Sequence, residues 1–316
     1  MTYNLEEEEK YLASYLESVS DVTKIQAISN RVYCCDASRS LYCPECYRML
    51  VSKSLWPGSI SFFPFHSIDI ILGIKERRTS STGIQMMCVC RMFAEAAIEA
   101  KKLLEHDQRI DKIPSTINDS NVLWWENIKL HDLNRNNTLP PFESEEDGTF
   151  VLFPEEGKSV PISSVAYKIK RLIILDIKWT RSANVKLFSD RHKLTKKNKS
   201  SEKHNPLASL KSLPFVHIEF PPKKSHYWRW HNRGEGMLST LEAIYFAGRE
   251  MCVALDKHTN REDLLSILWL FALQRSIIQN RCKEEGRRAA YSEEVKADAR
   301  ALRNPMKRKR MKNAES

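Results

Sequence analysis

Apolar runs bounded by turn residues alternate with longer segments of helical periodicity along this chain. The clearest run, Leu172 to Leu175, consists of leucine and isoleucine and ends in Asp176. Its composition predicts a strand that is buried on both faces. Similar runs lie at 68–72 and 149–154, and segments of helical spacing lie at 84–104 and 163–170. Strand and helix in this order predict an α/β fold with a mostly parallel sheet flanked by helices.

The same pattern predicts further elements around this sheet. We expect an opening helix at 5–19, a half-exposed alternating strand at 216–220, and helices at 238–255 and 263–282. Residues 106–148 are rich in Asp, Asn, Pro and Ser, which predicts a long excursion that docks on the body through Trp124-Trp125.

Changes in composition divide the chain into four parts. The main domain is expected at 51–284, with the insertion 106–148 and a basic loop at 191–205. It is preceded by the amino-terminal helical part, 1–30, and a cysteine-rich knuckle, 31–50, and followed by a basic polar tail, 285–316.

The positive charge is concentrated in two segments. The net charge is +10 with a pI near 9.1, which favours an anionic polymer as partner over a small acidic substrate. The basic loop and the tail cluster at 307–312 supply much of it. We interpret this cluster first as a nuclear-targeting signal and second as an RNA-contacting arm, which predicts a nuclear protein with the cytoplasm as second compartment.

Neither a membrane segment nor a secretory signal is expected. The longest apolar run, 264–273, is much shorter than the roughly 20 residues that span a bilayer. The amino terminus is acidic at Glu6 to Glu9 and lacks a basic region followed by an apolar stretch. The sequence therefore predicts an intracellular protein with reduced cysteines and no membrane partner.

Four of the eight cysteines crowd into the knuckle. Cys43 and Cys46 have the spacing with which two thiolates bind one tetrahedral zinc. Cys35 is expected as a third ligand, and the fourth is left open between Cys34, a distant residue and none, because adjacent residues rarely bind one metal together. A metal-free remnant or a reactive thiol pair is the alternative. The other four, predicted to be core residues, are Cys88, Cys90, Cys252 and Cys282.

Candidate chemistry gathers where strands end and helices begin. Asp176 and Trp179 follow the buried run, at the edge where ligands collect in open α/β sheets, although a turn cap and a core indole explain them equally well. Ser239 and Glu242 have capping-box spacing, which is sufficient as a structural explanation. Residues 227–230, Tyr-Trp-Arg-Trp, suit base stacking and phosphate pairing, or an amphipathic edge packed on the sheet.

Several of these pieces together resemble the DTW-domain family of tRNA-uridine aminocarboxypropyltransferases, in its eukaryotic type. The resemblance runs in order from about Cys35 to Asn280. Its segments are 35–46, Asp-Ile-Ile at 69–71, Ser81-Thr82, Leu-Phe-Pro at 152–154, 176–179, 227–229 and 238–245. Short motifs recur by chance, so the shared order and spacing carry the resemblance.

The resemblance implies a SPOUT-like fold with a knotted carboxyl-terminal region that binds S-adenosylmethionine. Such a protein moves the 3-amino-3-carboxypropyl group of that cofactor to N3 of a tRNA uridine and releases methylthioadenosine. It implies Asp176 as the base that removes the N3 proton. The implied cofactor-binding residues are Ser81, Thr82, Leu152, Phe153, Pro154, Trp179, Leu238, Ser239, Thr240 and Glu242. The tRNA phosphates would be bound by Lys193, Lys196, Lys197, Lys199 and Arg229.

The chain departs from the family's pattern at four positions near these motifs. Lys178 replaces a threonine, and Gly83 stands where alanine is frequent. Gly73 stands where a histidine is usual, and Ile74 where proline is common. These departures keep two other hypotheses open: a non-catalytic tRNA-binding relative, and a SPOUT-type RNA methyltransferase.

Overall fold

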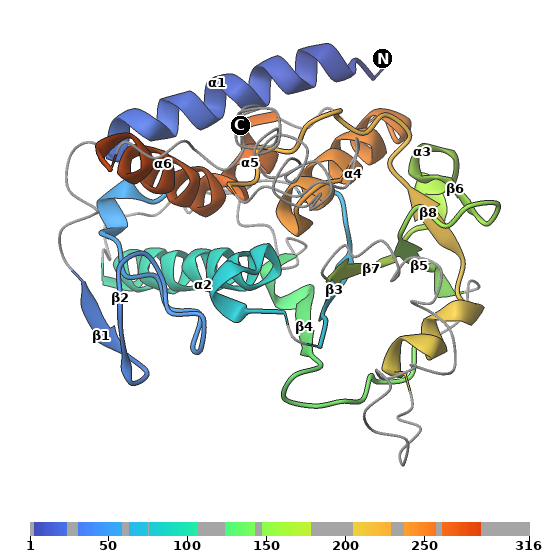
Figure 1. The fold of residues 1–316 in the computed structure, drawn as a ribbon, viewed down its shortest axis with the longest axis horizontal. Helices are drawn as coiled ribbons and strands as arrows, with labels where there is room; N and C mark the ends of the chain where they lie inside the picture. Colours follow the sequence, from blue (N-terminus) through green and yellow to red (C-terminus); the bar gives the residue numbers. More distant parts are fainter. Residues whose placement is uncertain are drawn as a thin grey trace, which may run out of the picture.

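Six parallel strands form one sheet at the centre of the computed structural model (Figure 1). Their order across the sheet is β4 (Ile128–Asp132), β3 (Ser67–Leu72), β7 (Arg171–Asp176), β5 (Thr149–Leu152), β8 (Phe215–His217) and β6 (Ser159–Pro161). The structure describes residues 3–23, 31–58, 63–74, 76–106, 124–142, 147–177, 205–228, 237–256 and 261–285. The predicted α/β fold with a parallel sheet and flanking helices is confirmed.

Helices cover the sheet. They are α1 (Leu5–Thr23), α2 (Thr82–His106), α3 (Ile162–Val165), α4 (Thr240–Ala254), α5 (Arg261–Ser266) and α6 (Trp269–Glu284). Figure 1 shows α1 as the outermost helix, lying along α6, while α2 runs beside β3 and β4. Short 3-10 turns connect these elements: η1 (Lys53–Leu55), η2 (Arg78–Ser80), η3 (Trp124–Asn127), η5 (Ala166–Lys168) and η6 (Pro206–Ser212).

Strand side chains alternate between two buried layers. Ile70 and Ile174 belong to the large core that the sheet forms with the helices. Ile71 and Ile173 point to the opposite face, where they join a smaller core with Leu210 of η6. Because successive side chains of a strand point to opposite faces, the continuous apolar runs bury both sides of the sheet, as predicted.

Several predicted elements are found with small shifts. The opening helix extends to Thr23, the strand before Asp176 begins at Arg171, and the helix predicted from residue 84 begins at Thr82. The docking role of the double tryptophan is also confirmed, since Trp124 is buried and stacks on Phe63 at a centroid distance of 4.6 Å.

Other predictions were wrong in detail. The expected excursion 106–148 contributes the edge strand β4, and the expected half-exposed strand 216–220 is the short, largely buried β8, because β5 and β6 flank it. The helix expected at 163–170 is only the single turn α3 followed by η5. The helix expected at 263–282 is broken at Ile267 into α5 and α6.

A buried ion pair ties α1 to the body. Glu8 of α1 and Arg249 of α4 are 1% and 6% exposed, and the guanidinium of Arg249 donates to both carboxylate oxygens of Glu8 at 3.0 to 3.2 Å. The hydroxyl of Tyr245 donates to the same carboxylate at 3.0 Å. Around this pair, Leu12 and Leu16 bury the apolar face of the helix. No helix in the described part of the chain is long and apolar enough to cross a membrane.

Replacing Glu8 by alanine should lower the free energy of unfolding by about 3–5 kcal/mol, because it leaves the guanidinium of Arg249 buried without its partner. Urea unfolding measures this change, with the exposed Glu6→Ala as control. The double variant Glu8→Met with Arg249→Met should recover most of the loss. A Glu8→Ala variant as stable as the Glu6→Ala control would contradict this role of the pair.

Candidate functional site

Asp176 lies at the carboxyl end of β7, where three segments that are distant in sequence converge. Its carboxylate accepts a hydrogen bond from the hydroxyl of Ser81 and another from the backbone N–H of Gly83, at 2.9 Å. The hydroxyl of Thr240, the first residue of α4, hydrogen-bonds to the same carboxylate. The end of β7 and the amino termini of α2 and α4 therefore meet at one side chain.

The strand register brings a fourth predicted segment to this edge. Leu152, the last residue of β5, lies opposite Ile174 of β7, so Phe153 and Pro154 follow at the same end of the sheet as Asp176. On the other side, Leu72 of β3 lies opposite Asp176. The pieces Ser81-Thr82, Leu152 to Pro154, Asp176 and Thr240 thus share one end of the sheet, which is where ligands bind in open α/β sheets.

The environment of Asp176 favours its protonated form. Burial raises the pKa of the carboxyl above its usual value, and the hydrogen bonds from Ser81, Gly83 and Thr240 offset only part of that rise. The residue keeps 9% of its surface exposed, so it is not sealed off from the edge of the sheet. A carboxylate with a raised pKa is a stronger base than an ordinary aspartate, which suits proton abstraction.

Two glycines let backbone segments approach this strand end closely. A Cβ on Gly83 would lie 2.6 Å from a carboxylate oxygen of Asp176, and a Cβ on Gly73 would lie 2.6 Å from the side chain of Ile177. Any side chain at either position would displace its neighbour. The departures from the family's pattern at these positions therefore fit the packing of this chain.

The predicted capping box at the start of α4 is present and extends further. The carboxylate of Glu242 accepts from the backbone N–H of Ser239 at 2.9 Å, and from Ser225 Oγ and the His226 backbone N–H, each at 2.6 Å. Glu242 is fully buried. Its oxygens are engaged by the protein itself, and they hold the segment 225–228 against α4.

This segment is joined to the Asp176 site by a tyrosine. The hydroxyl of Tyr227 donates to the carbonyl of Ser80 at 2.7 Å, one residue before Ser81. Trp228 is buried and lies 5.5 Å from Phe271 between ring centroids. The expected base-stacking aromatics are thus partly used inside the protein, as the alternative of a packed edge anticipates.

Part of the predicted site falls outside the described residues. This applies to Lys178 and Trp179, and to the proposed tRNA-binding residues Lys193, Lys196, Lys197, Lys199 and Arg229. Leu238 is described and is buried at 9% exposure, two residues before α4.

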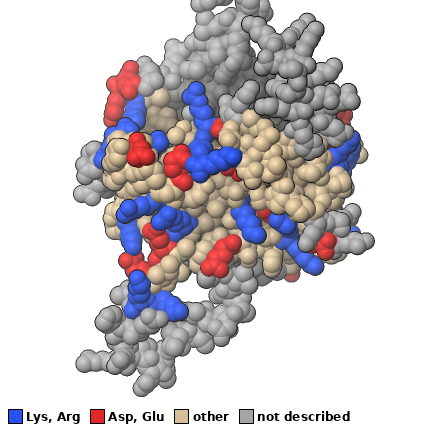
Figure 2. Space-filling view, turned by 90° about the horizontal axis from the view of Figure 1, so that it is seen from below, with Lys and Arg blue, Asp and Glu red and all other residues tan. Residues whose placement is uncertain are grey.

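The surface charge of the described residues is mixed. Figure 2 shows basic and acidic side chains side by side on the face seen from below. By contrast, residues 178–204 hold nine Lys and Arg against two Asp and Glu, and residues 286–316 hold ten against four. The basic excess of the chain therefore lies in these two segments.

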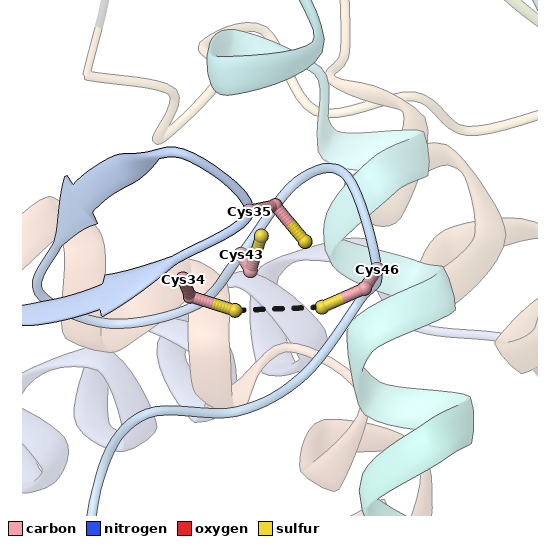
Figure 3. A group of neighbouring side chains, drawn as sticks. All are labelled: Cys34, Cys35, Cys43 and Cys46. Carbon is pink, nitrogen blue, oxygen red and sulfur yellow. Dashed lines mark hydrogen bonds between the residues drawn. The ribbon is translucent and has the colours of Figure 1, made fainter.

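The four amino-terminal cysteines form a second candidate site, shown in Figure 3. Cys34 and Cys35 come from the hairpin of β1 (Val32–Cys34) and β2 (Ala37–Arg39), and Cys43 and Cys46 come from the loop that follows. Their sulfurs all lie within 4.8 Å of one another, and those of Cys34 and Cys46 are 3.6 Å apart. Sulfurs of a tetrahedral zinc site lie about 3.8 Å apart, given Zn–S bonds of about 2.3 Å, so this set could hold a metal ion.

The hairpin turn explains why two adjacent cysteines can take part. Cys35 and Asp36 both have positive φ, 46° and 60°, and form the two-residue turn between β1 and β2. This tight reversal brings Cys34 and Cys35 to one side. Cys34 therefore lies with the three expected residues, and all four sulfurs are candidate ligands.

Backbone groups prepare one sulfur for metal binding. Burial opposes ionisation of Cys43, but the backbone N–H groups of Cys46 and Glu45 donate to its sulfur and lower its pKa to about 7. Hydrogen bonds with Cys46 and Cys43, together with desolvation, raise the pKa of Cys35 to about 12. Four thiolates this close repel one another, so their protons are lost together only when a cation replaces them.

The remaining cysteines are mostly core residues, as predicted. Cys88, Cys90 and Cys252 are buried. Cys282 is the exception, since it is only half-buried near the end of α6.

Sequence reasoning missed Arg78 and Asp132, which connect the cysteine loop to the sheet. Arg78 donates to the carboxylate of Asp132 and to the carbonyl of Pro44. The only sequence signal was the position of Asp132 after Ile128 to Leu130, which reads as a short strand once the surrounding excursion is set aside.

A comparison of the chain with protein-family models, with curated proteins and with solved structures finds no match. The resemblance to the DTW-domain family therefore rests on the order of the short motifs.

The raised pKa of Asp176 predicts a pH-dependent cost in stability. The folded protein holds this proton to higher pH than the unfolded chain does, so the contribution of Asp176 to the free energy of unfolding falls as pH rises above about 4. The stability of the wild type relative to Asp176→Asn should thus decrease between pH 4 and pH 8 in urea unfolding.

The exposed Asp256→Asn is the control for this measurement, because it removes the same charge at a left-handed position that asparagine tolerates. Its stability relative to the wild type should not fall in the same way. A wild type that gains stability over Asp176→Asn as pH rises would contradict a raised pKa.

Proposed function

We propose that this protein is an S-adenosylmethionine-dependent tRNA-uridine aminocarboxypropyltransferase in which Asp176 is the base. The observation that carries the proposal is the convergence of motifs on this carboxylate. Ser81, Asp176 and Thr240 belong to three separate pieces of the family resemblance, and they are in direct contact. Motifs matched by chance have no reason to meet at one side chain.

The groups at this strand end fit the cofactor chemically. A carboxylate, two hydroxyls and the first turns of two helices supply acceptors for an ammonium group and donors for a carboxylate. The methionyl part of S-adenosylmethionine carries both groups. Leu152 to Pro154 and Leu238 would contribute backbone and apolar contacts to the adenosine.

In the proposed reaction Asp176 takes the proton from N3 of the uridine. The hydroxyls of Ser81 and Thr240 and the N–H of Gly83 hold the carboxylate in one orientation, so little reorganisation is needed when the proton moves. When bound, S-adenosylmethionine would supply the electrophilic carbon that the N3 electron pair attacks, with methylthioadenosine as the leaving group.

The basic segments support tRNA as the substrate. Residues 178–204 start directly after Ile177, next to Asp176, and residues 229–236 start after Trp228, whose neighbour Tyr227 binds Ser80. Two segments that carry cationic residues thus follow in sequence directly after residues at or near the proposed site, and we propose that they bind phosphates.

We also propose a SPOUT-like fold and a nuclear location for this protein. A SPOUT-like arrangement with a knotted carboxyl-terminal region is supported by the parallel sheet and by α4 starting at the Asp176 edge. The tail cluster at 307–312 supports nuclear import.

We further propose that the cysteine cluster binds one Zn²⁺ and thereby fixes the amino-terminal knuckle. The support is the set of four converging sulfurs, with Cys34 and Cys46 at 3.6 Å. A four-cysteine site leaves no open position for a substrate, so this zinc would be structural.

Asp176→Asn should lower kcat by about 10²- to 10⁴-fold and change the Kd for S-adenosylmethionine by only a few-fold, since a base acts mainly in the transition state. The assay uses unmodified tRNA and labelled cofactor, with Asp256→Asn as control. Methylthioadenosine is the expected product. S-adenosylhomocysteine would identify a methyltransferase instead, and cofactor binding without turnover in the wild type would identify a non-catalytic relative.

Purified protein should contain about one Zn²⁺ per chain, and Cys43→Ser should lose it, because three sulfurs bind zinc much more weakly than four. Elemental analysis after dialysis measures the metal content. Cys282→Ser, which changes a cysteine outside the cluster, is the control and should keep the metal. A wild type that takes up no Zn²⁺ would show that the cluster is not a zinc site.

A further inference from the structure

Two side chains link the cysteine knuckle to the segment that leads to the Asp176 site. The hydroxyl of Tyr42 donates to the carbonyl of Thr79 at 3.4 Å, and Arg78 makes the larger set of contacts. Arg78 is the first residue of η2, and its side chain is only 12% exposed. One terminal nitrogen donates to the carbonyl of Pro44 at 2.6 Å and to the hydroxyl of Tyr47 at 3.2 Å. Pro44 lies between the cysteines 43 and 46, so Arg78 holds the loop from which two of the four sulfurs come.

The other terminal nitrogen of Arg78 anchors the same segment to the sheet. It donates to the carboxylate of Asp132 at the end of β4. Asp132 and Asp176 both lie opposite Leu72, on the strands that flank β3. The segment from Arg78 to Ser81 is thus tied to the ends of two strands, to Asp132 by its first residue and to Asp176 by its last.

Few residues separate these two anchors. The Ser81 N–H donates to the carbonyl of Arg78 at 3.4 Å, and the carbonyl of Ser80 accepts the Tyr227 hydroxyl. The hydroxyl of Ser81 donates to Asp176 and accepts the N–H of Ile84 at 2.9 Å. A shift of the Arg78 guanidinium would therefore move Ser81, three residues later, whose hydroxyl donates to Asp176.

Arg91 provides a natural contrast to Arg78. Its guanidinium donates to the carbonyl of Cys46 at 2.7 Å and so contacts the same knuckle. However, it extends from the middle of α2 and also pairs with Glu95 at 2.8 Å. It supports the knuckle without touching the segment 78–81.

We propose that Arg78 is a positioning residue through which metal binding at the cysteine cluster orders the Asp176 site. A cation held by the four sulfurs fixes the loop around Pro44, Glu45 and Tyr47, and these residues fix the guanidinium, Glu45 through an ion pair at 3.4 Å. When the loop opens, Arg78 keeps Asp132 but loses its contacts with the knuckle, and the Ser81–Asp176 hydrogen bond loosens. The inference rests on the proposed function for the role of Asp176 as base and for the zinc site.

Two backbone amides report the state of this site without any activity assay. The N–H of Gly83 donates to Asp176, and that of Ile84 donates to Ser81. Their hydrogen exchange is slow only while these two side chains stay in place. Exchange would be measured by NMR or by mass spectrometry with fragmentation, on the full chain with Zn²⁺ and after chelation.

In the wild type, chelation should speed exchange at Gly83 and Ile84 by about tenfold or more, while amides of the central strands β3 and β7 stay protected. Arg78→Gln should exchange fast at both amides with and without Zn²⁺. Arg91→Gln, the matched control, should keep the response to Zn²⁺. Arg78→Lys should fall between, because one ammonium cannot reach all three acceptors.

Four outcomes would overturn the proposal. They are an unchanged exchange at Gly83 and Ile84 on chelation of the wild type, an Arg78→Gln variant that responds like the wild type, a general loss of protection in β3 and β7, and a wild type that takes up no Zn²⁺. The exchange result does not depend on turnover. If transfer activity is absent but the coupling is present, the proposed function fails and this inference stands.

Discussion

The arrangement of the carboxyl end of the sheet depends on the hydrogen bonds that the buried carboxylate of Asp176 accepts. A carboxylate removed from water needs hydrogen-bond donors, and it obtains them from Ser81, Gly83 and Thr240. Each donor belongs to the start of a helix, so satisfying one buried group fixes where α2 and α4 begin relative to β7. A residue with a side chain does not fit at position 83 without a shift, because its Cβ would lie 2.6 Å from a carboxylate oxygen of Asp176. The same donors that make burial tolerable also orient the oxygen that would accept a proton.

Two further sets of contacts, from segments outside the sheet, hold the residues around Asp176 in place. Glu242 fixes the segment 225–228 against α4, and Tyr227 of that segment holds the carbonyl next to Ser81. On the other side, Arg78 joins the cysteine knuckle to the end of β4. The cysteine knuckle and the segment 225–228 thus both contact the short turn at 78–81. These contacts form a continuous path from the cysteine cluster to the carboxylate of Asp176.

Sequence patterns were sufficient for the central elements and insufficient for the connections. The runs ending at Leu72 and Asp176 predicted buried strands because two-sided burial leaves few polar positions in a run. The exception is Asp69, which is buried and paired with Arg171 and His131. The strand at Ile128–Asp132 was missed because its side chains, apart from Ile128, are only partly covered, so its run is short and mixed. The contacts of Arg78 could not be predicted, since they join residues up to 54 positions apart. Cys34 was left open because only the left-handed turn at Cys35 and Asp36 brings it to the other sulfurs.

We propose that cofactor and uridine meet at the convergence around Asp176. A crystal structure of the protein with bound S-adenosylmethionine tests this proposal. We expect the cofactor at the carboxyl edge of β5 and β7, with its sulfonium carbon chain facing Asp176 and its adenosine beside Leu152 to Pro154. A cofactor bound away from this edge, with Asp176 still enclosed by Ser81, Gly83 and Thr240, would contradict it.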